Sequence, residues 1–176
     1  MSRHYEDSTV EVIEVLNNGL RVETGIATAA GGLLFTADQN LEIFKVYGEI
    51  RINLMFGECT TVFSADAAQG MFMFHSTTPH LAAGAMSIDC ASVSGLAEGA
   101  RIVFQGDLVG TAPTVTGGAG VSYYPATGAK MIVGRPGGEG EILLHNIAVQ
   151  TIATGAMAFT LCYTPISEGA YAEAMF

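Results

Sequence analysis

Histidine is the side chain best suited to proton transfer and metal binding near neutral pH, and this chain has four. His75 and His80 lie five residues apart, with Pro79 between them. Residues at that spacing point to opposite faces of a strand, so the pair is poorly placed to share a metal ion. His145 lies in an apolar run, which favours a core or interface histidine over a general base. A cysteine–histidine nucleophile pair stays open, because such partners meet only in the folded chain.

Glycines and carboxylates form two further patterns that suggest chemistry. Residues 117–120 read GGAG, but a phosphate-binding loop follows a strand, opens a helix and normally carries a lysine. Residues 121–125 read VSYYP instead, so the stretch predicts a plain loop. Single acidic residues beside glycines are typical of turns and surfaces, which makes paired acid–base catalysis a weak hypothesis. The carboxylates concerned are Glu58, Asp66, Asp89 and Asp107.

Aromatic side chains give the candidate interaction surface. The chain has no tryptophan, so a platform for stacking sugar rings would rest on the adjacent Tyr123 and Tyr124 in the glycine-rich stretch. Tyr171 and Phe176 lie in the last residues, and aromatic rings seldom stay in water, so we expect this tail to pack on its own domain or on a neighbour. No catalytic, cofactor-binding or metal-binding residue is assigned from the sequence.

Composition favours a subunit of an assembly. Hydrophobic residues make up 49% of the 176 residues and charged residues only 14%, against about 25% in typical domains. Obligate interfaces are depleted in charge in this way, whereas large exposed apolar patches are uncommon on monomers. We therefore expect one domain that forms a homo-oligomer.

The remaining charge is one-sided and excludes some partners. There are 17 Asp plus Glu against 7 Lys plus Arg, a net charge of −10. Nucleic acids and anionic membrane surfaces are bound through Lys and Arg, so neither is an expected partner. The first residues lack the pattern of a secretory signal, and no apolar run is long enough to cross a bilayer. Three widely spaced cysteines predict free thiols in a protein made in a reducing cytoplasm.

Residues 44–56 give the clearest structural signal. Every second residue is apolar or glycine, which predicts one strand of about 43 Å with one face in a core. Gly57 interrupts this alternation and predicts a β-bulge or a bend. The buried face would carry Phe44, Val46, Gly48, Ile50, Ile52, Leu54 and Phe56.

The rest of the chain reads as short strands joined by glycine-rich turns, with no periodic helix. Asn18-Gly19 predicts a hairpin between residues 10–16 and 20–26. Residues 110–130 predict a long loop, and residues 135–138 (RPGG) a tight turn. Further strands are expected at 71–74, 86–93, 101–109, 130–133, 141–152 and 157–164. The fold class is all-β, a β-sandwich of jelly-roll type. Its expected parts are an N-terminal arm and hairpin (1–32), the sandwich (33–166) and a C-terminal tail (167–176).

Three segments of the chain carry a shared pattern. The first is residues 46–61, with VYGEI, then Leu54, then GECTT. The others are MSIDC at 86–90 and FTLCYTPI at 159–166. The chain resembles, over about two thirds of its length, a loosely defined group of small β-rich virion proteins encoded by tailed bacteriophages. These are accessory head proteins that decorate or cement the capsid.

The resemblance implies a non-enzymatic protein on the phage head surface that has no cofactor. Its partners would be itself, as a homotrimer, and the major capsid protein. Decoration proteins bind a repetitive lattice on the outside of the shell, away from packaged DNA, where an acidic chain is tolerated. A tail or neck component is an alternative within the same particle. A carbohydrate-binding module for host attachment, using Tyr123 and Tyr124, is the alternative from another class.

Overall fold

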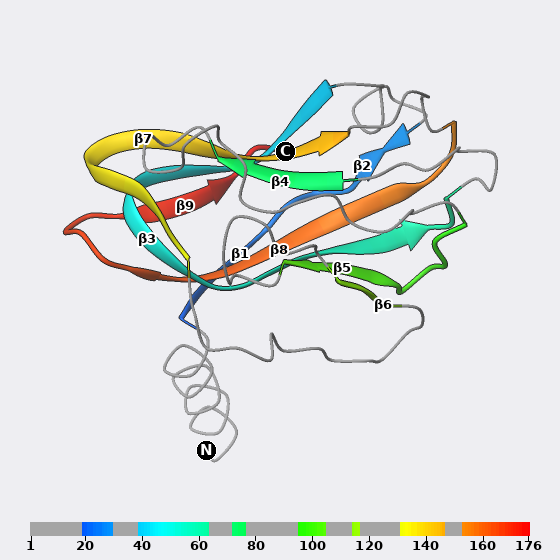
Figure 1. The fold of residues 1–176 in the computed structure, drawn as a ribbon, viewed down its shortest axis with the longest axis horizontal. Helices are drawn as coiled ribbons and strands as arrows, with labels where there is room; N and C mark the ends of the chain where they lie inside the picture. Colours follow the sequence, from blue (N-terminus) through cyan, green and yellow to red (C-terminus); the bar gives the residue numbers. More distant parts are fainter. Residues whose placement is uncertain are drawn as a thin grey trace, which may run out of the picture.

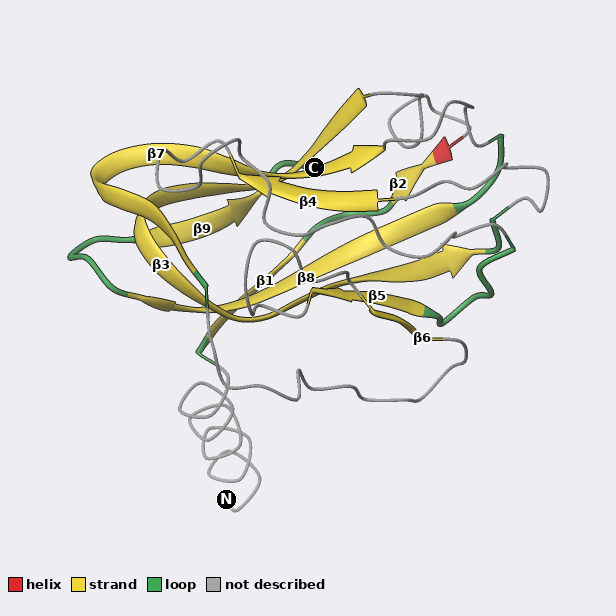
Figure 2. Ribbon diagram, viewed as in Figure 1, coloured by secondary structure: helices red, strands yellow, loops and turns green. Residues whose placement is uncertain are grey.

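The computed structural model describes residues 19–29, 39–63, 72–76, 95–104, 114–116, 131–146 and 153–176. These residues form β-strands and turns, with a 3₁₀ turn at Ala29 and no α-helix among them (Figure 2). The all-β prediction is therefore confirmed for this part of the chain. The strands are β1 (Leu20–Glu23), β2 (Ala27–Thr28), β3 (Gln39–Thr61), β4 (Phe72–Ser76), β5 (Arg101–Phe104), β6 (Thr114–Thr116), β7 (Ile132–Asn146), β8 (Ala156–Pro165) and β9 (Tyr171–Ala174).

All nine strands belong to one antiparallel sheet centred on β3. The first half of β3 pairs with β7 and β9, and its second half pairs with β8 and β5. β4 extends the sheet beyond β7, β1 and β2 pair with β8, and β6 pairs with β5. Figure 1 shows the sheet bent back on itself, so that β3 runs through both arms of the bend. Because the strands are hydrogen-bonded into one sheet, the jelly-roll sandwich stays a prediction.

The bend lies at Gly48, where β3 adopts a positive φ of 71°. A side chain at this position would begin 2.7 Å from Ser167 Oγ and 2.8 Å from Ala170 Cβ. Only glycine combines that backbone with so close an approach. The neighbouring Glu49 fixes the connection between β8 and β9: its N–H donates to Ser167 Oγ at 2.9 Å, and its carbonyl accepts from Ile166 N at 2.8 Å.

β7 follows β3 around the bend by a longer path. Between the pairs Tyr47–Glu139 and Glu49–Gly134, β3 has one residue and β7 has four, residues 135–138. In Figure 1 β7 curves around the outside of the bend, where a strand needs more residues than its inner partner. The predicted tight turn at RPGG is thus wrong as an end of the strand. These residues form a bulge within one 15-residue strand.

Burial along β3 confirms the predicted face as far as Ile52. Phe44, Val46, Gly48, Ile50 and Ile52 are all buried, and the residues that alternate with them are partly exposed. The prediction is wrong for Leu54 and Phe56, which are only partly buried, while Met55 is fully buried. The cause is a register shift against β8 between Ile52 and Leu54. An extra residue in one strand moves every later side chain to the opposite face.

Gly57 is not the predicted bulge. It pairs regularly with Phe159, and the register shifts lie on either side of it, at Asn53 and Thr60. A side chain at Gly57 would begin 2.5 Å from the Met157 sulfur and 2.8 Å from the Phe159 ring. Glycine therefore makes room in the core for a neighbouring aromatic ring.

One apolar cluster fills the space between the arms. Phe44 and Ile142 enter it from the β3–β7 arm, and Ile102, Phe159 and Leu161 enter it from the strands of the other arm. Burying each such side chain contributes roughly 1.5–3 kcal/mol, so the bent sheet is held closed by this shared core.

The C-terminal residues pack on their own chain, as expected. β9 pairs with residues 44–47 of β3, and Ala172 N donates to the Tyr163 hydroxyl at 3.0 Å. The expected division into arm, sandwich and tail stays a prediction. β1, β2 and β9 are all hydrogen-bonded into the same sheet.

The remaining expected elements have mixed outcomes. Strands at 71–74 and 101–109 are confirmed in part as β4 and β5, and β6 lies inside the predicted loop 110–130. The first strand of the predicted hairpin and the strand at 86–93 lie outside the described residues. The expected return strand is present as β1, which pairs with β8.

We predict that Gly48→Ala lowers the free energy of unfolding by about 3 kcal/mol, because strain from the positive φ adds to overlap with Ala170. Gly137→Ala is the matched control, since its φ of 68° is similar and nothing lies within 4 Å of the added carbon. It is expected to cost about 1 kcal/mol. Urea unfolding measures both, and equal losses would show that the bend has no special packing constraint.

The register shift at Asn53 makes a second prediction. Met55→Ala is expected to cost about 3 kcal/mol, because it leaves a cavity in the core. Leu54→Ala is expected to cost about 1 kcal/mol, since Leu54 lies on the outer face. Thermal unfolding of the two variants compares them directly. A larger loss of stability for Leu54→Ala would show that Leu54, not Met55, faces the core, and would contradict the register shift at Asn53.

Candidate functional site

The structure describes two of the four residues expected to form an interaction surface, Tyr171 and Phe176. Tyr123 and Tyr124 lie outside the described residues. Tyr171 is 44% exposed on the edge strand β9. Phe176 is partly buried against the core, and its carbonyl accepts a hydrogen bond from Gly25 N at 2.8 Å. Tyr171 is thus the member of this set with a described, exposed ring.

Tyr171 stacks on Tyr47, a residue that sequence reasoning did not select. The two tyrosines are opposite each other in the β3–β9 ladder, their ring centroids are 4.4 Å apart, and their planes differ by 16°. The signal in the sequence is weak, because Tyr47 is simply a polar-side residue of the long strand. The pair exists only through the register between β3 and β9.

Charged groups surround this tyrosine pair. The Lys45 ammonium lies 5.0 Å from the centroid of the Tyr47 ring and 3.1 Å from Glu139 Oε2. The Tyr47 hydroxyl donates to Glu173 Oε1 at 2.8 Å. Hydrogen bonding to Glu173 raises the pKa of Tyr47, and hydrogen bonding to Tyr47 and Glu139 raises the pKa of Lys45. At neutral pH this surface therefore carries a protonated Lys45 and a neutral Tyr47 phenol.

We call the surface formed by Lys45, Tyr47, Glu139, Tyr171 and Glu173 the tyrosine face. Its residues come from β3, β7 and β9 and are paired across the ladders as Tyr47–Glu139, Tyr47–Tyr171 and Lys45–Glu173. Directly opposite residues in a sheet point to the same side. The face is therefore the outer surface of the arm formed by β7, the first half of β3, and β9.

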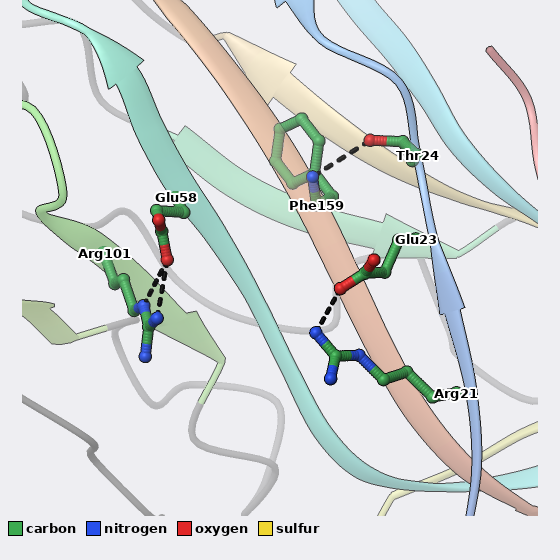
Figure 3. Close-up of polar contacts among 6 residues, drawn as sticks. All are labelled: Arg21, Glu23, Thr24, Glu58, Arg101 and Phe159. Carbon is green, nitrogen blue, oxygen red and sulfur yellow. Dashed lines mark hydrogen bonds and ion pairs between the residues drawn. The ribbon is translucent and has the colours of Figure 1, made fainter. Parts of the chain in front are cut away.

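A cleft of about 350 Å³ lies on the outer face of the other arm. Figure 3 shows two ion pairs on the two sides of β8: Glu58 with Arg101, from β3 and β5, and Arg21 with Glu23, from β1. The floor carries small side chains, among them Ala158 and Thr160. Phe56 also lines this cleft, and its outward position follows from the register shift at Asn53.

The ion pair between Glu58 and Arg101 is the less exposed of the two. Arg101 Nε and Nη2 lie 2.7 and 2.6 Å from the same carboxylate oxygen, and the guanidinium lies 4.7 Å from the centroid of the Phe56 ring. Both side chains are about a third exposed, so the pair contributes only a small share of stability. Glu58, a carboxylate considered for acid–base chemistry, is thus paired with an arginine.

The described residues include only part of the other chemistry considered from the sequence. His75 lies in β4 and His145 lies in β7, and these two strands are paired, with Phe74 opposite Leu144 and Met73 opposite His145. His80 and the three aspartates considered above lie outside the described residues. No group of three or more His, Cys, Asp or Glu in the described residues is placed to hold a metal ion. In the same residues no helix is long and apolar enough to span a bilayer.

Two of the three cysteines, Cys59 and Cys162, are buried and form no disulfide. Cys59 Sγ donates to the carbonyls of Thr61 at 3.1 Å and Leu96 at 3.4 Å. Burial raises the pKa of the Cys59 thiol. A raised pKa keeps the thiol protonated, which makes it a packing residue and a poor nucleophile.

Comparison of the chain with protein-family models, with curated proteins and with solved structures found no match.

The raised thiol pKa gives a prediction for alkaline pH. The folded chain holds the Cys59 proton more tightly than the unfolded chain does, so this contribution to stability is fully present below the unfolded pKa of about 8.5 and is lost as pH rises through the folded value. The destabilisation caused by Cys59→Ala should therefore be smaller at about pH 10 than at about pH 7.5. Urea unfolding at both pH values measures it, and a pH-independent difference would contradict the raised pKa.

Proposed function

We propose that this chain is a non-enzymatic structural protein of a tailed-phage particle, a decoration or cement protein that forms a homo-oligomer and binds the head lattice. The proposal starts from the sequence resemblance and from the composition. A chain with 49% hydrophobic and 14% charged residues is suited to permanent contact with other subunits. Its site of action would be the outer surface of the phage head, after synthesis in the bacterial cytoplasm.

Exposed aliphatic side chains beside the bend are the observation that carries this proposal. Ile132 lies on β7, opposite Arg51 of β3, and is 46% exposed. Ile166 lies on the other side of β3, hydrogen-bonded to Glu49, and is 47% exposed. Both flank the outward residues of β3 at the bend. Branched aliphatic residues held in water on a rigid sheet are favourable contacts for a second protein surface.

The bent sheet also fits the finer fold that we propose, a jelly-roll type of β-sandwich with the two arms as its layers. One apolar core shared by both arms supports this arrangement. A rigid sandwich presents its outer faces at fixed positions, as binding to a repetitive lattice requires. The homotrimer and the major capsid protein as lattice partner belong to the same proposal.

The direct test is mass spectrometry of purified particles, in which the chain is expected at a stoichiometry comparable with that of the capsid subunits. A cryo-EM map of the same particles is expected to place it on the head. Density on the tail would favour the tail or neck alternative, and absence of the chain from particles would overturn the proposal. Binding to a glycan array that depends on Tyr124 would favour host attachment instead.

Self-association provides a second prediction. We expect sedimentation to show an oligomer of the purified chain, and Ile166→Glu to weaken it by about tenfold or more, because a desolvated charge opposes contact. Val62→Glu is the matched control, since Val62 is 52% exposed at the far end of β3. A monomeric wild type, or equal effects of the two variants, would contradict an interface at the bend.

A further inference from the structure

The tyrosine face has an acidic surround. Four glutamates lie on β7, on β9 and in the turn that leads into β9. Two cations accompany them, Lys45 on β3 and Arg135 in the β7 bulge. The four glutamates are Glu139, Glu141, Glu168 and Glu173. Exposed aromatic rings within an acidic surface attract cations, because the ring face is negative and the carboxylates add a longer-range field.

The face already binds one cation from its own chain. The Lys45 ammonium lies 5.0 Å from the centroid of the Tyr47 ring and forms an ion pair with Glu139 at 3.1 Å. This arrangement combines an aromatic face with one carboxylate. Lys45 stays protonated, because hydrogen bonding to Tyr47 and Glu139 raises its pKa.

A second aromatic ring with a nearby carboxylate lies on β9, the strand next to β3: these are Tyr171 and Glu173. Tyr47 covers one face of the Tyr171 ring, and β9 has β3 as its ladder partner among the described strands. The other face of the 44% exposed ring is therefore turned to the sheet edge. Exposed Glu173 lies two residues along the same strand, where side chains share a side of the sheet, and its Oε1 already orients the Tyr47 hydroxyl.

We propose that the outer face of the Tyr171 ring, together with Glu173, is a docking site for an arginine or lysine side chain of a partner protein. The bound cation would repeat at the sheet edge the contact that Lys45 makes with Tyr47 and Glu139. Charge complementarity identifies the partner surface as basic. If the chain binds the lattice as proposed, the lattice surface at this contact would be basic. The site itself is inferred from the geometry of the tyrosine face.

A neutral sugar is the competing ligand, since it also stacks on tyrosine. The acidic surround favours the cation, because carboxylates add attraction for arginine or lysine that a neutral ring does not feel. An acidic partner surface would meet repulsion at the same place. The experiment distinguishes these cases.

The test uses the full chain and a capped tetra-arginine peptide, followed by the NMR signals of ¹³C-labelled tyrosine rings at low salt. We expect the Tyr171 and Tyr47 signals to shift with added peptide. Tyr171→Leu is expected to weaken binding about fivefold, because leucine still covers Tyr47 but has no π face. Tyr171→Phe keeps the ring and is expected to stay within about twofold of wild type.

Glu173→Gln tests the carboxylate and is expected to weaken binding about threefold, while its amide oxygen still accepts from Tyr47. Glu98→Gln is the matched control, because it makes the same change of net charge at an exposed position in the turn before β5. It is expected to change the affinity less than twofold, about the effect of bulk charge alone. Each variant is compared with wild type in thermal unfolding, so that a folding defect is recognised.

Four results would each overturn the proposal. Equal weakening by Glu173→Gln and Glu98→Gln, or unchanged binding by Tyr171→Leu, would show attraction to the overall charge only. Absence of any ring-signal shift would remove the site. Shifts of Tyr171 with maltoheptaose but not with tetra-arginine would identify a sugar platform. These outcomes are independent of whether the chain is found in phage particles, which tests the proposed function.

Discussion

The left-handed backbone of Gly48 is the constraint on which the rest of the structure depends. It lets one 23-residue strand, β3, turn from one arm of the sheet into the other without ending. Its neighbours then adapt: β7 adds the four residues of its bulge, and the connection from β8 to β9 hydrogen-bonds to Glu49. The two arms enclose one core because a single strand belongs to both.

The sequence was sufficient for the strand and its buried face through Ile52, because alternation is a local signal that needs no knowledge of the partner. It failed from Leu54 onward, since the extra residue at Asn53 is defined only against β8. The same reason explains RPGG at 135–138. Proline and glycine favour a turn locally, but the partner strand continues past them, and the residues become a bulge.

The candidate surfaces show a similar division. Tyr171 was selected because terminal aromatic residues rarely stay in water, and this reasoning needs only the sequence. Tyr47 was missed because its importance comes from stacking on Tyr171, across 124 residues of chain in a register that no local pattern encodes. Composition indicated contact with other subunits, but it could not indicate which face makes that contact. We propose that this contact lies at the bend, where Ile132 and Ile166 are exposed and the tyrosine face forms the outer surface of one arm.

Amide hydrogen exchange in the native state tests most directly whether β3 joins the arms into one cooperative unit. The account predicts that the slowest amides of β7 and β9 in one arm and of β8 in the other exchange with the same free energy, through unfolding of the whole sheet. If one arm opened at a clearly lower free energy than the other, the bend at Gly48 would be a hinge between independent parts, and the account would be contradicted.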